Sequence, residues 1–306
     1  MTAPTAPPAK ADPASLPPTH LLIGLAVVAV WGSNFVVIKA ALGHLPPLLF
    51  AFLRFGLAAL PALFVPRPKV AWRNLAAYGL LIGAGQFGLL FIAMGRDISP
   101  GLASLVVQSQ VFFTIGLAAI LAGERVRGHQ IAGLVLGAAG IGLIAMMAKG
   151  AATPLGLALT LIAALSWAGG NLVARAAGPV NMIGYIAWAS LFSAPPLLAA
   201  SLLLEGLPRI ETGLTHADWT VWAAVLWQTI GNTMFGYGLW GWLLARHPAA
   251  TVAPMALAVP VFGMATAAVV MAEPLPAWKL AAAGLVLGGL AVNLLWPKVV
   301  GWMGWG

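Results

Sequence analysis

The amino-acid sequence predicts an all-α integral membrane protein, in which ten transmembrane helices form two inverted five-helix repeats. Three observations predict this fold. Of the 306 residues, 61% are hydrophobic and only 7% are charged, whereas a soluble domain carries about 25% charged residues. The apolar residues form runs of roughly 20, enough to cross a hydrocarbon core about 30 Å thick. The second half of the chain also repeats landmarks of the first half in the same order.

The apolar runs define the spans, and the joints between them are too short to hold a soluble domain. Residues 1–19 are rich in Pro and Ala and nearly uncharged, which predicts a disordered cytoplasmic tail. Residues 297–306 are expected to form a second cytoplasmic tail. Pro or charged residues interrupt the apolar sequence at each joint. The predicted spans are 21–42, 47–65, 72–95, 101–122, 129–148, 154–175, 180–204, 217–245, 249–271 and 277–296.

The basic residues predict how the chain crosses the membrane. With the amino terminus inside, five Lys and Arg residues lie outside, Arg54 falls within a span, and nine are cytoplasmic. An excess of Lys and Arg on the cytoplasmic side is the general rule. We therefore expect a multi-pass protein of the bacterial inner membrane with both termini in the cytoplasm. The nine cytoplasmic residues are Lys10, Arg67, Lys69, Arg73, Arg125, Arg127, Arg175, Arg246 and Lys298.

Four landmarks recur with slowly growing offsets and define a first repeat over 20–148 and a second over 154–296. Each repeat holds five spans, an odd number, so the copies enter the membrane from opposite sides. Inverted repeats are typical of secondary transporters, whose substrate site lies near the midplane; a duplication that only built a stable bundle is the alternative. The landmarks are Trp31 and Lys39 recurring as Trp167 and Arg175, Arg96 as Arg246, 122–124 as 271–273, and 132–137 as 283–288.

Uncharged polar side chains within the spans predict a central cavity. Such groups are costly in a membrane unless they find partners or line a wet space. Any single amide could instead form a hydrogen bond between helices. Together, the amides offer the several neutral partners that the amino and carboxylate groups of a zwitterion need. Aromatic side chains within the spans could stack on a flat substrate, although others face lipid. The predicted cavity residues are Trp31, Asn34, Tyr78, Gln86, Gln108, Trp167, Asn171, Gln228, Asn232 and Tyr237.

Two basic residues and two prolines are candidates for gates or hinges. Lys39 and Arg175 occupy matching places in the two repeats. A cation there could attract a substrate carboxylate, lock a closed state, or simply extend to the lipid headgroups. Pro254 and Pro260 break the hydrogen-bond ladder of the ninth span. That break predicts either a hinge or backbone carbonyls freed for a substrate amino group.

Three further charged residues have simpler interpretations. Glu124 and Glu273 follow the fourth span of each repeat, and we expect each to stabilise the amino-terminal end of the next helix; a gate is the alternative. Arg54 is expected to neutralise a helix end or to contact lipid phosphate. None of the acidic or His residues falls in the middle of a span. Proton-coupled transporters usually hold such a group, so we expect the substrate gradient to drive transport, with loose coupling as the alternative.

Several of these residues resemble the EamA-type repeat of the drug/metabolite transporter superfamily. The resemblance rests on residues 31–35 (Trp-Gly-Ser-Asn-Phe) and 123–125 (Gly-Glu-Arg), and in the second repeat on Trp167, 260–262 (Pro-Val-Phe) and 272–274 (Ala-Glu-Pro). It implies a ten-helix exporter of amino acids or other small metabolites, with the first, third, fourth, sixth, eighth and ninth spans around the cavity. The chain most resembles the YddG-type exporters of aromatic and other neutral amino acids. Val111 replaces the proline usual in the family, which predicts a fourth span straighter than the ninth.

Composition and motifs exclude other classes of protein. The chain has no Cys, which excludes disulfides, thiolate metal sites and cysteine nucleophiles. No set of reactive side chains lies at membrane depth, so we expect neither an enzyme nor a bound cofactor or metal. The expected partners are a small-molecule substrate and the bilayer, without nucleic acid; a homodimer is possible but not required. A drug or nucleotide-sugar transporter of the same fold, or a channel, is the alternative function.

Overall fold

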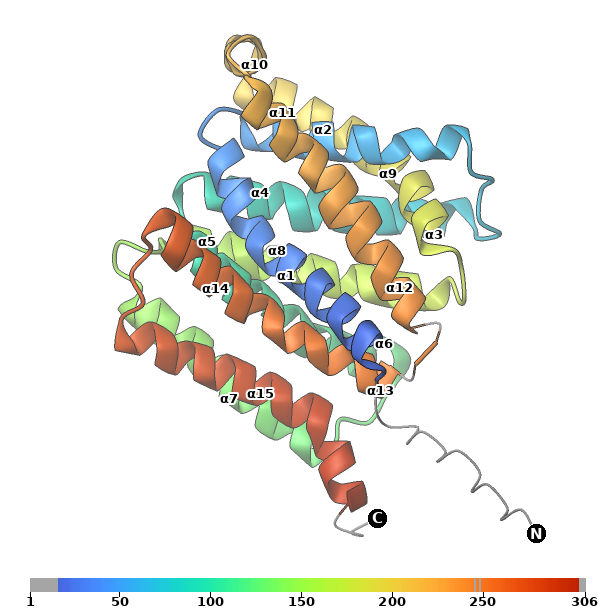
Figure 1. The fold of residues 1–306 in the computed structure, drawn as a ribbon, viewed down its shortest axis with the longest axis vertical. Helices are drawn as coiled ribbons and strands as arrows, with labels where there is room; N and C mark the ends of the chain where they lie inside the picture. Colours follow the sequence, from blue (N-terminus) through green and yellow to red (C-terminus); the bar gives the residue numbers. More distant parts are fainter. Residues whose placement is uncertain (1–15, 245, 248, 303–306) are drawn as a thin grey trace, which may run out of the picture.

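The computed structural model describes residues 16–244, 246–247 and 249–302, which are almost entirely helical (Figure 1). Within these residues, the β-type pairing is an isolated bridge between Ile98 and Ala152. The first-half helices are α1 (Pro18–Ala41), α2 (Pro47–Ala59), α3 (Trp72–Gly79), α4 (Leu89–Arg96), α5 (Pro100–Val106), α6 (Gln110–Ala122) and α7 (Gly128–Met147). The second-half helices are α8 (Pro154–Ala176), α9 (Met182–Ala200), α10 (Leu207–Thr215), α11 (Trp219–Leu226), α12 (Gly238–Leu244), α13 (Ala249–Val252), α14 (Ala258–Met271) and α15 (Ala277–Trp302).

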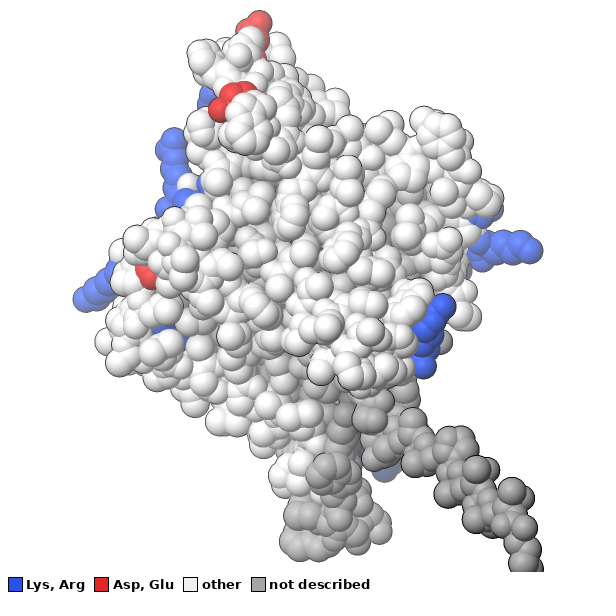
Figure 2. All heavy atoms as spheres, viewed as in Figure 1, with Lys and Arg blue, Asp and Glu red and all other residues white. Residues whose placement is uncertain are grey.

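The described chain is an all-helical membrane protein. Eight of its helical stretches are long and apolar enough to cross a membrane, and Pro47–Leu63 forms a shorter apolar helix. A further run is helical from α11 to α12. Figure 2 shows a face almost free of charge, with the charged side chains at its edges. A helical stretch therefore occupies each predicted span, while the count of ten crossings stays a prediction.

The short helix α10 lies where we expected a loop. Pro208 stands in its first turn, where the missing backbone N–H costs least. Ile210 and Gly213 are buried, and Gly213 lies against the loop at His44 and Pro46. Tertiary contact with this loop therefore accompanies helix formation in a segment too polar to predict as a span.

The two halves pack as counterparts of each other. α1 packs against α14, and its counterpart α8 packs against α6, the counterpart of α14. α2 packs against α9 and α7 against α15, so both pairs map onto themselves when the halves are exchanged. Figure 1 shows α7 and α15 side by side, and α1 begins on the side of the bundle where α15 ends. A two-fold relation between the halves predicts this pattern of neighbours.

Corresponding helices are also interrupted at corresponding places. The third and eighth spans each contain a π-helical segment, η2 (Leu80–Gly88) and η5 (Trp227–Tyr237). The fourth and ninth spans each contain a 3-10 segment, η3 (Val107–Ser109) and η6 (Ala253–Leu257). Such interruptions inside long helices are frequent at functional sites.

The fourth span is interrupted although Val111 replaces the usual proline, and its being straighter than the ninth stays a prediction. This span tightens to a 3-10 segment without a proline. The Thr114 hydroxyl donates to the Gln110 carbonyl at 2.7 Å, a local bond that bends helices. The Gln108 amide also donates across the bundle to the Ala256 carbonyl of η6, at 3.4 Å. Side-chain hydrogen bonds thus accompany the interruption of the fourth span. In the ninth span, Pro254 lies at the corresponding interruption.

Candidate substrate cavity

A cavity of about 390 Å³ lies between the two halves of the described chain. Small-molecule sites typically enclose roughly 300–1,000 Å³. The π-helical and 3-10 segments of both halves contribute to its wall, together with α1 and α8. Nine of the ten predicted cavity residues line it: Trp31, Asn34, Tyr78, Gln86, Gln108, Trp167, Asn171, Asn232 and Tyr237.

Gln228 is the predicted cavity residue that does not line the wall. It is completely buried behind Asn34. The Asn34 Nδ2 donates to Gln228 Oε1 at 3.3 Å, and Gln228 Nε2 donates to Asn34 Oδ1 at 2.6 Å. Gln228 therefore holds the Asn34 amide in position and does not itself contact the cavity.

The remaining polar groups of the wall are partly paired. Asn171 Nδ2 donates to Gln110 Oε1 at 2.8 Å. The Trp31 indole N–H donates to the Asn232 carbonyl at 3.1 Å. Gln86 is buried, and its Oε1 has no partner within the described residues. Leaving such an acceptor unsatisfied costs about 1–3 kcal/mol, which a ligand N–H would recover.

Aromatic rings form an apolar part of the same wall. The Trp31 ring centroid lies 5.3 Å from that of Tyr237 and 5.2 Å from that of Trp240. All three rings line the cavity, as does Trp167 of α8. The cavity therefore combines neutral amides with aromatic surface, which suits a small polar molecule carrying an apolar side chain.

Lys39 follows the cavity-lining Ile38 on α1 and forms hydrogen bonds between helices. Lys39 Nζ donates to the carbonyls of Met94 at 2.8 Å and Gly95 at 3.0 Å. These carbonyls lie at the carboxyl end of α4, where the helix dipole favours a cation. The cavity extends toward the opposite end of the bundle, where Met182 and Leu294 line it.

Arg175, the counterpart of Lys39, makes a different contact. Its guanidinium forms an ion pair with Glu124, and the two side chains are 61% and 50% exposed. Exposed pairs of this kind contribute about 0–1 kcal/mol. The expectation that Glu124 serves the helix that follows it is not met, because its carboxylate reaches α8 instead.

Glu273 contacts the first turn of the next helix and also a helix of the other half. Its carboxylate accepts hydrogen bonds from the Ser99 hydroxyl and, at 3.0 Å, from the Gly101 backbone N–H at the start of α5. It also pairs with Lys279 of α15 at 2.7 Å, and Lys279 is 1% exposed. A helix amino terminus attracts a carboxylate as expected, but the helix belongs to the other half of the chain.

Arg54 is the residue whose partners the sequence interpretation missed. Its place within the second span predicts burial, and it is 1% exposed, but its partners are neither a helix end nor lipid phosphate. Its Nη1 donates to Gln228 Oε1 at 2.9 Å and its Nη2 to Thr233 at 3.3 Å. Its guanidinium carbon lies 3.6 Å from the centroid of the Phe87 ring. The sequence signal for a buried position was that Arg54 lies near the middle of a predicted span, whereas Lys39 and Arg175 lie near span ends.

These features define a class of protein: a helical membrane transporter with a cavity between two related halves. The chain belongs to the EamA-like transporter family, whose sequence model matches it twice, at residues 19–146 and 154–295. It is therefore a transporter and not an enzyme. Within the described residues, no cluster of three or more His, Cys, Asp or Glu side chains is placed to hold a metal ion.

Relatives of the chain are named as transporters. The chain is 44% identical over 284 residues to a probable amino-acid metabolite efflux pump of Salmonella typhimurium, covering 90% of this chain and 95% of that protein. It is 42% identical over 290 residues to a protein of the same description from Escherichia coli K12, covering 91% and 97%. It is also 30% identical over 166 residues to the uncharacterized inner membrane transporter YedA of that organism, covering 52% and 54%.

A solved crystal structure supports the fold. It superposes with a TM-score of 0.64, covering 91% of this chain and 96% of the other chain, at 21% sequence identity. At this identity the likeness shows the fold alone, and substrate must be argued from the cavity.

Proposed function

We propose that this protein exports neutral or aromatic amino acids, or closely related metabolites, across the bacterial inner membrane. Two inverted halves of five spans each would alternate access to the cavity, with both termini in the cytoplasm. The observation that carries the proposal is the amide- and aromatic-lined cavity between the halves. The description of both closely similar relatives as amino-acid metabolite efflux pumps supports the same substrate class.

The chemistry of the wall favours a zwitterion over a nucleotide sugar. No Lys or Arg is among the described residues that line the cavity. A nucleotide sugar carries a diphosphate, which proteins usually bind with cations or helix amino termini. A zwitterion is neutral overall and needs several donors and acceptors at short range. Gln86, Asn34 and Asn171 supply neutral groups of this kind.

The contrast between the two ends of the cavity supports alternating access. Lys39 binds the carboxyl end of α4, and in this proposal that contact closes one end of the cavity. Arg175 occupies the matching place on α8 but is exposed and bound to Glu124. In the opposite conformation we expect Arg175 to bind the carboxyl end of α12, the counterpart of α4, while Lys39 is released. Pro254, in η6, and Pro260, in the first turn of α14, lie where the ninth span would bend.

Trp167→Ala is expected to weaken amino-acid export, because it removes aromatic surface from the cavity wall. Alanine substitution of a residue that stacks on a ligand typically costs about 10-fold or more in affinity. Counterflow of labelled phenylalanine in proteoliposomes measures the effect as a rise in the half-saturating concentration.

Trp219→Ala is the matched control, because Trp219 is 79% exposed at the start of α11 and is not among the residues that line the cavity. Equal counterflow by the wild type and Trp167→Ala would contradict the proposed cavity. Absence of phenylalanine counterflow by the wild type would reject the proposed substrate class.

Lys39→Met is expected to open the closed end of the cavity more often, because it removes two charge-assisted hydrogen bonds. Bonds of this type stabilise by about 1.5–3 kcal/mol, enough to shift the population of open molecules about 10-fold or more. The chain has no Cys, so Val107→Cys in the cavity wall introduces a single thiol. Its labelling in intact cells by a membrane-impermeant reagent measures opening.

Lys149→Met removes an exposed cation after α7 and is the matched control. Its labelling should equal that of the Val107→Cys protein alone. If Lys39→Met also leaves the labelling unchanged, Lys39 does not hold the closed end.

A further inference from the structure

The charge of Arg54 has no counter-ion in the described part of the chain. The two ion pairs there join Arg175 to Glu124 and Lys279 to Glu273. Arg54 is 1% exposed, and its contacts are two neutral oxygens and the face of Phe87. An isolated charge is expensive to bury and is normally paired. Within the described residues, the bundle therefore buries a cation that has no carboxylate partner.

Arg54 also retains hydrogen-bond donors and lines a small pocket. Guanidinium has five N–H groups, and two of them are engaged by Gln228 and Thr233. Its Nε–H has no partner within the described residues. The pocket that Arg54 lines has a volume of about 10 Å³, room for about one water molecule.

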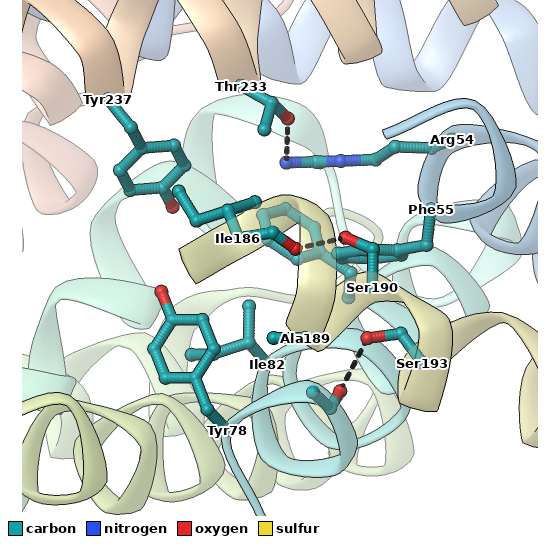
Figure 3. Close-up of a pocket in the computed structure, with 12 residues that line it drawn as sticks. Arg54, Phe55, Tyr78, Ile82, Ile186, Ala189, Ser190, Ser193, Thr233 and Tyr237 are labelled. Atoms are coloured by element: carbon teal, nitrogen blue, oxygen red, sulfur yellow. Dashed lines mark hydrogen bonds between the residues drawn. The ribbon is translucent and has the colours of Figure 1, made fainter. Parts of the chain in front are cut away.

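Two tyrosines connect this pocket to the substrate cavity. Tyr78 and Tyr237 line both spaces, as does Phe87. Figure 3 shows the two phenol groups approaching each other, with Arg54 entering the same pocket beside Thr233. Neither phenol hydroxyl forms a hydrogen bond with another residue drawn in Figure 3. Two phenol O–H donors thus stand at the cavity wall, with a buried cation behind them.

We propose that this arrangement is the site for the carboxylate of the transported substrate. The carboxylate accepts hydrogen bonds from Tyr78 and Tyr237 in the cavity, and Arg54 provides the counter-charge from behind. The unpaired Oε1 of Gln86, on the same cavity wall, is then available to the substrate ammonium group. The identity of the transported molecule rests on the proposed function, whereas the selection of a carboxylate rests on Arg54 and the two phenols.

The test compares three probes that differ in their charged groups: phenylalanine, phenylacetate, which lacks the amine, and phenethylamine, which lacks the carboxylate. Binding to the purified full-length protein is measured by tryptophan fluorescence, and counterflow of phenylalanine is measured separately. Because a charged hydrogen-bonded contact accounts for about 10- to 100-fold in affinity, Arg54→Met should weaken phenylalanine and phenylacetate by that factor. Binding of phenethylamine should not change.

Three further variants separate the site from the scaffold. Arg54→Lys retains the charge and should restore part of the affinity for phenylacetate. Tyr78→Phe removes one hydroxyl and should weaken the two carboxylate probes selectively. Arg209→Met removes an exposed cation on α10 and should change none of the affinities.

The outcomes distinguish this inference from the proposed function. If Arg54→Met weakens all three probes equally, Arg54 is only structural and the inference is wrong. A second outcome would show that the site binds a halide. In that outcome, chloride competes with phenylacetate, and Arg54→Met abolishes a chloride requirement without altering the preference for carboxylate. The inference is then also wrong. If the wild type fails to transport phenylalanine yet binds phenylacetate through Arg54, the proposed substrate fails and the inference stands. Binding of no probe to the wild type overturns both.

Discussion

Glu273→Ala is expected to lower the free energy of unfolding by about 3–5 kcal/mol, the usual effect of removing one partner of a buried ion pair. The substitution leaves the Lys279 ammonium, which is 1% exposed, without its counter-charge. It also removes the acceptor for the Gly101 backbone N–H at the start of α5. Unfolding of the purified protein by sodium dodecyl sulfate in mixed micelles, followed by tryptophan fluorescence, measures the loss.

Two comparisons identify the buried charge as the cause. Glu124→Ala removes the corresponding carboxylate of the first repeat, whose ion pair is exposed, and should cost no more than about 1 kcal/mol. The double variant Glu273→Ala/Lys279→Met removes both buried charges and should recover part of the stability, because apolar replacements of buried pairs are often neutral. Equal stability of Glu273→Ala and Glu124→Ala would show that burial of the pair has no consequence.

Gly32→Ala is expected to destabilise the protein by about 1–3 kcal/mol, the usual cost of adding a methyl group to a filled contact. A Cβ on Gly32 would lie 2.5 Å from the Val259 carbonyl oxygen and 2.9 Å from the Gly263 backbone nitrogen. Backbone atoms of α14 yield only if the two helices separate. Because Trp31 and Asn34 are close to Gly32 on α1, separation displaces the cavity wall, and phenylalanine counterflow should fall as well.

Gly284→Ala is the matched control for this helix contact. Gly284 lies within α15, and nothing approaches the place of its Cβ within 4 Å. Alanine forms helices better than glycine by about 1 kcal/mol, so this variant should be unchanged or more stable. If Gly32→Ala matches it in stability and counterflow, α1 and α14 do not need their close approach.

The residues of the candidate cavity could be chosen from the sequence because membrane burial restricts polar side chains so strongly. An amide within an apolar run has few favourable locations, and nine of the ten predicted residues do line one cavity. Their role in binding substrate stays a proposal. Gln228 falls behind the wall because Asn34 lies between it and the cavity, and no spacing along a single helix reveals that order.

The wrong and missing assignments share a physical cause. Arg54 contacts Gln228 and Thr233, which are 174 and 179 residues away in the chain. Glu273 contacts Ser99 at a separation of 174 residues. Hydropathy and periodicity describe one helix at a time, so they cannot tell which neighbour a charged side chain meets. Arg54 at a helix end and Arg54 at the bundle centre are equally consistent with the local pattern.

By itself, the sequence determined that this chain is helical, belongs in a membrane and consists of two related halves. These properties follow from composition, the length of the apolar runs and the recurring landmarks. All of them can be read along the chain without knowing which helices are neighbours. Only the tertiary structure decided which carbonyls Lys39 contacts, where the carboxylates pair, and that the buried Arg54 shares a pocket with two tyrosines. Those outcomes depend on the rotation of each helix about its axis and on contacts between distant segments, which packing of the whole bundle selects.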